Sequence, residues 1–177
     1  MQLRSLAIAT AAVAAFGSAQ AIVLTGNTTG APTYNRAFAN FSGLSPSGTG
    51  VNYRTTTFTV SANGAYDFLS TATGAWDNFL FLYTPSFNPA TPLVNGVIGN
   101  DDFPTIGLSG FNAVPLTTGT NYVLVTTGFN PAAFGAFTNS ITGPGNVVVV
   151  PEPQSYALMA MGLLAIGGWA RRRSANS

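Results

Sequence analysis

Carboxylates and amides are the side chains of this 177-residue chain that could do chemistry, because several reactive residue types are absent. The chain contains no histidine, no cysteine and no lysine. Histidine-dependent triads, thiol nucleophiles, Schiff bases, disulfides and the usual zinc sites are therefore excluded. The remaining acidic groups are four aspartates and one glutamate: Asp67, Asp77, Asp101, Asp102 and Glu152.

One constellation, Asp77 and Asn78 together with Asn100, Asp101 and Asp102, could hold a metal ion. Ca²⁺ takes about six to eight oxygen ligands, and these carboxylates and amides fall in two predicted loops. If the two loops lie side by side, a calcium site at Asp77, Asn100, Asp101 and Asp102 results. Asp and Asn also cap turns by bonding to their own backbone, and the regular spacing of a dedicated calcium loop is missing. Calcium binding and turn capping both stay open, and no other cofactor is predicted.

The residue types that are present argue against catalysis. A carboxylate-dependent hydrolase is the remaining enzymatic alternative, because paired carboxylates can act as acid and base. Asp101 and Asp102 are adjacent, however, and adjacent side chains of a strand point to opposite faces, so a turn would have to bring them together. No glycine-rich phosphate loop follows a strand and opens a helix. We therefore expect a protein that is not an enzyme.

The aromatic residues allow two interpretations. Trp76 is either part of a core or an exposed platform that stacks on a sugar next to Asp77. The segment 129–137 carries three phenylalanines among Gly, Ala and Asn. It is either the tip of a long hairpin or an exposed apolar loop that contacts a partner.

The positive charge of the chain lies mainly at its two ends. All six cations are arginines, and only Arg36 and Arg54 fall within residues 22–150, where four aspartates oppose them for a formal charge of −2. No basic surface exists for a phosphate backbone, so nucleic acid is excluded as a partner. Charged residues make up 6% of the chain, where about a quarter is usual, so Thr, Ser, Asn and Gly must supply most of the polar surface.

Residues 1–21 have the pattern of a secretory signal peptide. Arg4 supplies the positive start, and residues 6–16 form an uncharged, largely apolar run that is shorter than the about 20 residues of a membrane span. Ala19 and Ala21 place small residues where signal peptidase needs them, which predicts a signal helix and cleavage after Ala21.

The C-terminal residues 151–177 have three parts in a fixed order. Pro151, Glu152 and Pro153 come first, an apolar stretch at 156–170 follows, and Arg171, Arg172 and Arg173 come near the end. As a helix the stretch spans only about 22 Å, which suits a short, transient passage of the inner membrane. The arginines are expected to stay on the cytoplasmic side.

This order of parts resembles the PEP-CTERM sorting signal of exported proteins in Gram-negative bacteria. The resemblance implies that an exosortase, a membrane-embedded processing enzyme, recognises the tail and releases or transfers the protein. It also implies a destination at the cell surface or outside the cell, in bacteria that make exopolysaccharide. An ordinary tail anchor is the alternative.

Residues 22–150 alternate short strand-like runs with Gly, Pro, Asn and Thr. Alternation at 55–60 predicts a half-buried strand, and Asn63-Gly64 predicts a two-residue hairpin that returns as a strand at 65–70. Residues 79–83 are apolar on both faces, which indicates a central strand covered twice. Further strands are predicted at 93–98, 121–127 and 147–150, with an edge strand or two before residue 53. Together they predict an all-β fold, an antiparallel jelly-roll-like β-sandwich.

The sequence of residues 53–128 is similar to that of bacterial pre-peptidase C-terminal-like domains. The similarity rests on the aromatic run Trp76-Asp77-Asn78-Phe79-Leu80-Phe81-Leu82-Tyr83, the acidic turn Asn100-Asp101-Asp102 and the strand-like runs around them. It implies a β-sandwich that serves secreted proteins as an accessory, binding or secretion module and is not catalytic. We therefore expect a surface or matrix protein that acts by adhesion or structural association in an exopolysaccharide or biofilm layer. A carbohydrate-binding module is the alternative.

Overall fold

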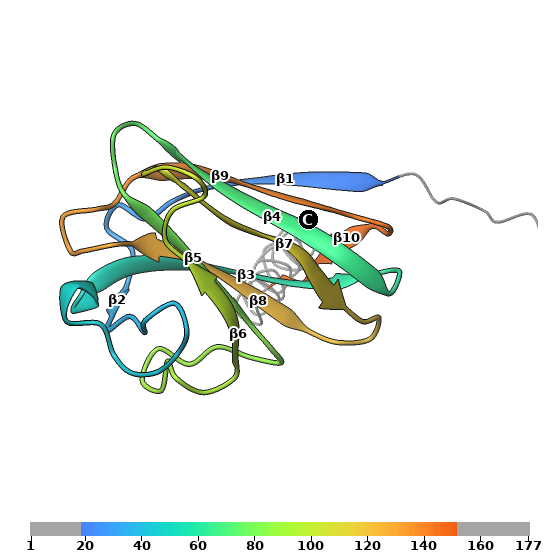
Figure 1. Cartoon of the computed structure of the whole chain (residues 1–177), viewed down its shortest axis with the longest axis horizontal. Helices are drawn as coiled ribbons and strands as arrows, with labels where there is room; N and C mark the ends of the chain where they lie inside the picture. Colours follow the sequence, from blue (N-terminus) through green and yellow to red (C-terminus); the bar gives the residue numbers. More distant parts are fainter. Residues whose placement is uncertain (1–18, 152–177) are drawn as a thin grey trace, which may run out of the picture.

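The computed structural model describes residues 19–151, which form two antiparallel β-sheets that pack face to face (Figure 1). The four-stranded sheet has the order β1 (Gln20–Asn27), β9 (Ala136–Gly143), β4 (Gly64–Thr73) and β7 (Leu108–Leu116). The other sheet has the order β10 (Val147–Val149), β3 (Val51–Val60), β8 (Tyr122–Gly128), β5 (Asn78–Tyr83) and β6 (Gly96–Asn100), and β2 (Thr33–Tyr34) also pairs with β3. The predicted all-β antiparallel sandwich is confirmed.

The main core lies between the two sheets and follows from alternation along the strands. Inward residues of β3 meet inward residues of β4, and the rings of Phe58 and Phe68 are 6.1 Å apart. Leu80, Leu82 and Ile141 are fully buried in the same cluster. Burial of such side chains contributes about 1.5–3 kcal/mol each, which makes this cluster the main source of stability.

The strand β5 is buried along its whole length, as its apolar sequence predicts. Leu80 and Leu82 point into the main core, whereas Phe79, Phe81 and Tyr83 belong to a second apolar cluster on the other face of the sheet. Two long loops supply the cover for that second cluster. From the loop 35–50, which contains the 3₁₀ turn Pro46–Gly48, the ring of Phe41 lies 5.5 Å from those of Phe81 and Tyr83. From the loop 84–95, Phe87 lies 4.8 Å from Tyr83.

The predicted hairpin at Asn63-Gly64 is wrong. The turn exists, but β3 pairs with β8 and β10, while β4 pairs with β7 and β9, so the chain crosses from one sheet to the other. The physical reason is that β3 and β4 cover the same core from opposite sides. The loop is held in this path because the Ser61 N–H donates to the carbonyl oxygen of Asn146 and the Asn146 N–H donates to Ser61 Oγ.

Most other predicted strands are present, with shifted ends. The strand expected at 93–98 begins only at Gly96, because Asn95 has a φ of 67° and ends a turn in which Leu93 and Val94 are exposed. The strands β7 and β9 were not predicted. Buried polar and glycine positions such as Asn139 and Gly143 hide the apolar alternation of β9.

The segment 129–137 is not a hairpin tip, because it connects β8 and β9, which belong to different sheets. Phe129 packs against the second apolar cluster and Phe137 is buried in β9, so only Phe134 is largely exposed. The exposed apolar patch expected here is therefore reduced to one ring.

Several predictions concern residues outside 19–151 and stay predictions. These are the signal helix, the membrane helix at 156–170, and Glu152, Pro153 and Arg171–Arg173 of the tail. Within the part of the chain that the structure describes, no helix is long and apolar enough to span a bilayer. Ala21 lies in β1 opposite Thr142, and cleavage after it would leave a strand that begins at Ile22.

Candidate functional site

The structure brings the three aspartates Asp77, Asp101 and Asp102 together. One carboxylate oxygen from each lies within 4.8 Å of the others. The pairing of β5 with β6 explains this, since Leu80 near the start of β5 lies opposite Asn100 at the end of β6. Asp77 directly precedes β5, and Asp101 and Asp102 directly follow β6. All three therefore meet where β5 begins and β6 ends. We call them the acidic cluster.

Asn100, the fourth predicted metal ligand, has a different partner. Its Oδ1 accepts a hydrogen bond of 3.2 Å from the N–H of Gly110, so it links the end of β6 to β7 and does not cap its own turn. Next to it, Ser109 Oγ lies within hydrogen-bonding distance of the carbonyl oxygens of Asn78 and Asp101 and can donate its one proton to either of them, which brings the start of β5 close to the loop after β6. The hydrogen bonds of Asn100 and Ser109 to backbone groups hold this region together. The carboxylates of Asp77, Asp101 and Asp102 take no part in these hydrogen bonds.

Burial and mutual repulsion make the acidic cluster unfavourable when it is fully ionised. The Oδ1 atoms of Asp77 and Asp101 are buried and have no hydrogen-bond partner. Burial, followed by the charges of Asp77 and Asp102, raises the pKa of Asp101 to about 6. Burial and the charge of Asp102 also raise the pKa of Asp77. At neutral pH the native state therefore holds negative charge that a proton or a cation would relieve.

Arg36 lies close to the acidic cluster, and no local sequence pattern predicts a role for it. It is only 2% exposed, and its guanidinium lies 4.1 Å from the centre of the Phe79 ring. Nη1 donates to the carbonyl oxygen of Ala37 at 3.0 Å and Nη2 to that of Phe129 at 2.8 Å. Its charge acts to lower the pKa of Asp77 and of Asp101, yet these groups form no ion pair within residues 19–151. The only sequence signal was its rarity, as one of two cations in the domain.

Trp76 does not have the exposed position that a sugar-stacking residue needs. It is 8% exposed, packs with Ala133 and Phe137, and donates from Nε1 to the carbonyl oxygen of Ala136 at 2.9 Å. A Cβ at Gly135 would lie 2.8 Å from the indole, so glycine is required for this close packing. The core interpretation of Trp76 fits the structure, and the sugar-stacking alternative does not, because a ring packed in this way cannot stack on a ligand.

The acidic cluster is chemically suited to a hard cation. Three carboxylates can provide oxygen ligands from two loops, and two of their oxygens have no competing partner. Carboxylates this close, two of them with a raised pKa, also resemble the acid–base pair of glycoside hydrolases. Two cavities of the described residues, one near Phe38 and one near Arg54, are lined by residues other than the three aspartates.

Comparison with known proteins identifies the C-terminal end of the chain. The family model of the PEP-CTERM protein-sorting motif matches residues 149–173, which confirms the sorting-signal interpretation. This match covers only the end of the chain and says nothing of the sandwich. No curated protein matches the sequence.

The solved structures that resemble the sandwich include the following three. The pre-peptidase C-terminal domain of collagenase from Bacillus anthracis is 12% identical, with a TM-score of 0.39 over 68% of this chain and 87% of that one. The Yersinia pseudotuberculosis-derived mitogen is 10% identical, with a TM-score of 0.37 over 70% and 85% of the two chains. The K3 adhesin domain of Lys-gingipain from Porphyromonas gingivalis is 14% identical, with a TM-score of 0.36 over 71% and 73%.

A calcium titration tests the cation interpretation of the acidic cluster. If Ca²⁺ binds Asp77, Asp101 and Asp102, saturating calcium should raise the melting temperature of the exported protein, and EDTA should reverse the change. A Ca²⁺ concentration one hundred times Kd would add about 2.7 kcal/mol to the free energy of unfolding. Asp102→Asn should remove most of the response. A melting temperature that calcium and EDTA leave unchanged would show that the acidic cluster does not bind calcium.

The pH dependence of stability tests the electrostatics without calcium. Because the pKa of Asp101 is about 6 in the folded protein and about 3.9 in unfolded chains, the folded state binds this proton more tightly. The stabilisation is complete below the unfolded pKa and is lost as the pH rises through about 6. In EDTA the melting temperature should therefore be higher near pH 5 than near pH 7, as thermal unfolding followed by circular dichroism would report.

Asp101→Asn should flatten this pH dependence and raise the melting temperature at neutral pH. The matched control is Asp67→Asn, because the Asp67 carboxylate accepts a hydrogen bond from the Ala113 N–H and does not belong to the acidic cluster. An Asp101→Asn variant with the full pH dependence of the wild type would contradict the account.

Proposed function

We propose that this chain, which carries a PEP-CTERM protein-sorting motif, is an exported protein that an exosortase-type enzyme directs to the surface or matrix of a Gram-negative bacterium. The match at residues 149–173 is the observation that carries the proposal. The signal-peptide pattern of residues 1–21 supports it independently, since export places the sandwich on the outer side while the arginines remain inside.

The path of the chain into the tail fits this role. Strand β10 pairs with β3, the Val150 N–H donates to the carbonyl oxygen of Thr57, and Pro151 follows at once. From Pro151 to the start of the apolar stretch at residue 156, five residues reach at most about 18 Å. During sorting the folded sandwich would therefore lie next to the membrane, with the Pro-Glu-Pro motif between the two.

We further propose that the sandwich is not catalytic and acts by structural association in an exopolysaccharide or biofilm layer. The absence of His, Cys and Lys from the sequence supports this, as does its low content of charge, which leaves a neutral surface rich in hydroxyls and amides. A carbohydrate-binding module is the second candidate. It differs in requiring a defined ligand site, and a cavity lined by hydroxyl, amide and guanidinium groups between β1 and β3 favours it.

Mutation of the tail tests the sorting proposal. Glu152→Gln, and separately deletion of Arg171–Arg173, should leave unprocessed protein in the inner membrane and reduce the amount released from the cell. Membrane fractionation with immunoblotting measures both quantities. Asp67→Asn, an equivalent change within the sandwich, is the control and should be sorted normally. Unchanged release of both tail variants would show that neither Glu152 nor the three arginines are needed for sorting, which would contradict the proposal.

A further inference from the structure

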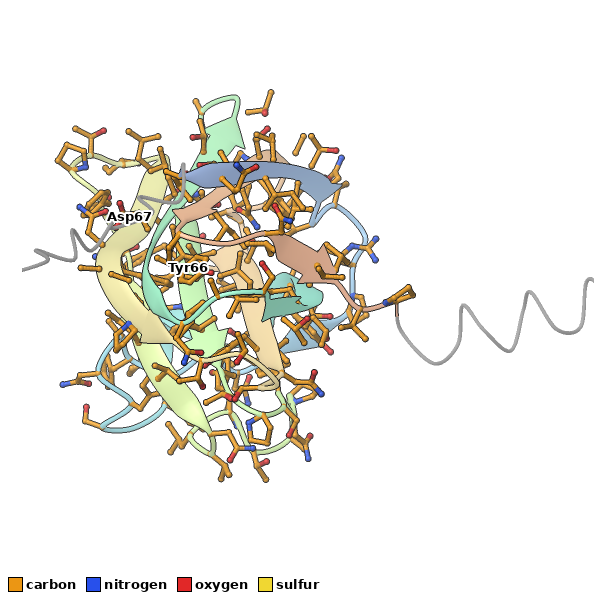
Figure 2. All side chains as sticks on the ribbon, turned by 90° about the vertical axis from the view of Figure 1, so that its right-hand side faces the viewer. Tyr66 and Asp67 are labelled. Carbon is orange, nitrogen blue, oxygen red and sulfur yellow. The ribbon has the colours of Figure 1, made fainter. Side chains whose placement is uncertain are left out.

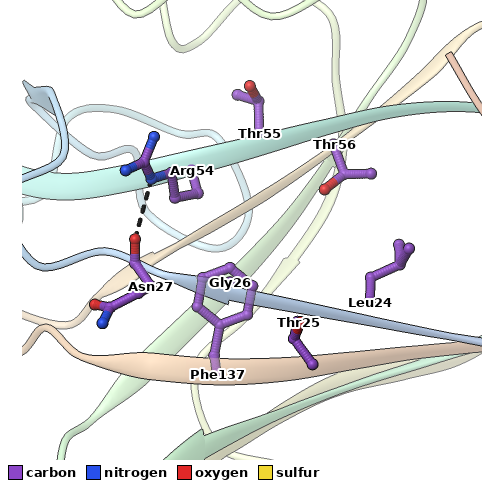
Figure 3. A pocket seen from close by; sticks show the side chains of 8 residues that line it. All are labelled: Leu24, Thr25, Gly26, Asn27, Arg54, Thr55, Thr56 and Phe137. Carbon is purple, nitrogen blue, oxygen red and sulfur yellow. Dashed lines mark hydrogen bonds between the residues drawn. The ribbon is translucent and has the colours of Figure 1, made fainter. Parts of the chain in front are cut away.

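A cavity of about 320 Å³ lies between β1 and β3 at the side of the sandwich (Figure 3). Figure 2 shows the side chains on all strands of the sandwich, and Figure 3 shows those around this cavity. Leu24 and Gly26 belong to β1, Arg54 and Thr56 to β3, and Phe137 to β9. The volume is near the lower end of the range for small-molecule sites, about 300–1,000 Å³.

The register of the strands explains why these residues meet. On β3, Arg54 and Thr56 share the face of the buried Phe58, because alternate residues point the same way. On β1, Leu24 packs against the main core, and Gly26 lies opposite Phe137 in the pairing with β9. A Cβ at Gly26 would lie 2.3 Å from the Phe137 ring, so glycine lets the ring extend to the floor of the cavity. Figure 3 shows Phe137 pointing from β9 towards β3, below Arg54.

Arg54 is held in one orientation with its hydrogen-bonding capacity largely unused. Its Nε donates to the carbonyl oxygen of Asn27 at 3.0 Å, which fixes the plane of the guanidinium. Within residues 19–151, Nη1 and Nη2 have no hydrogen-bond or ion-pair partner. The aspartates of the domain are placed elsewhere, Asp67 on Ala113 and the other three in the acidic cluster. A guanidinium presented in this way matches the two oxygens of a carboxylate.

We propose that this cavity binds an acidic saccharide unit, with its carboxylate on Arg54. The hydroxyl of Thr56 and the amide of Asn27 would bind sugar hydroxyls, and the half-buried Leu24 would contact the apolar side of the ring. The mixture of one cation, neutral hydroxyl and amide groups and a small apolar floor suits a polyhydroxylated anion. The inference rests on the proposed association with exopolysaccharide and names the chemistry and the place of that contact.

The test is isothermal titration of the exported protein with α-1,4-linked trigalacturonate. Binding is expected for the trisaccharide and should weaken as salt is raised, because the contact is a charge pair. The carboxyl-reduced trisaccharide should bind at least tenfold more weakly. Arg54→Gln should weaken binding of trigalacturonate at least tenfold, with Thr56→Ala in between. Thr71→Ala, an exposed threonine on β4, is the control and should bind as the wild type does.

Three outcomes would overturn the proposal. Equal binding by Arg54→Gln and the wild type would place the contact elsewhere, and equal binding of a triglutamate peptide would show a general anion site instead of a saccharide site. If the protein does not bind trigalacturonate, a parallel assay measures whether it co-sediments with native matrix polysaccharide. Co-sedimentation without trigalacturonate binding would reject the cavity as the binding site and leave the proposed function intact. If the protein neither binds trigalacturonate nor co-sediments, the proposed association with polysaccharide is rejected as well.

Discussion

The burial of β5 on both faces is the constraint on which the rest of the structure depends. A sandwich needs only one apolar face per strand, but all six residues from Asn78 to Tyr83 are buried. The main core covers Leu80 and Leu82, and the outer rings need a second cover that the loops 35–50 and 84–95 provide. Because β6 must follow the second loop and pair with β5, the same constraint places the end of β6 beside the start of β5. The acidic cluster is a consequence of that pairing.

Arg36 shows how the loop cover is attached. A buried cation is costly unless it is paired or hydrogen-bonded, and here the backbone oxygens of Ala37 and Phe129 accept from Nη1 and Nη2 while the Phe79 ring faces the guanidinium. Its buried Nε has no hydrogen-bond partner. These contacts join the loop 35–50 to the β8–β9 connection and to β5. The guanidinium lowers the pKa of Asp101 only through its charge at a distance, and burial, followed by the charges of Asp77 and Asp102, outweighs it and raises that pKa to about 6. One arginine thus stabilises the outer layer and leaves the acidic cluster available for a proton or a cation.

The local order of polar and apolar residues predicted individual strands correctly where that order is regular. The alternation at 55–60 and the continuous apolar run at 79–83 identified β3 and β5, and the rarity of charge directed attention to Asp77, Asp101 and Asp102. The turn at Asn63-Gly64 was predicted, but its sequence does not state which sheet the next strand joins. The strand β9 was missed because its inward residues include Asn139 and Gly143. The burial of Trp76 and the partners of Arg36 depend on residues about 60 and 90 positions away, which no local pattern reveals.

The sandwich and the two ends of the chain have separate roles in this account. The ends determine where the protein goes, and the sandwich provides a nearly uncharged body with two polar sites, the acidic cluster and the Arg54 cavity. The most direct test is the intact mass of the protein released from the cell, with sequencing of both termini. The account predicts an N-terminus at Ile22 and a C-terminus that lacks the apolar stretch 156–170 and the arginines after it. A released protein that retains residues 156–177 would contradict the central claim that the tail is a processed sorting signal.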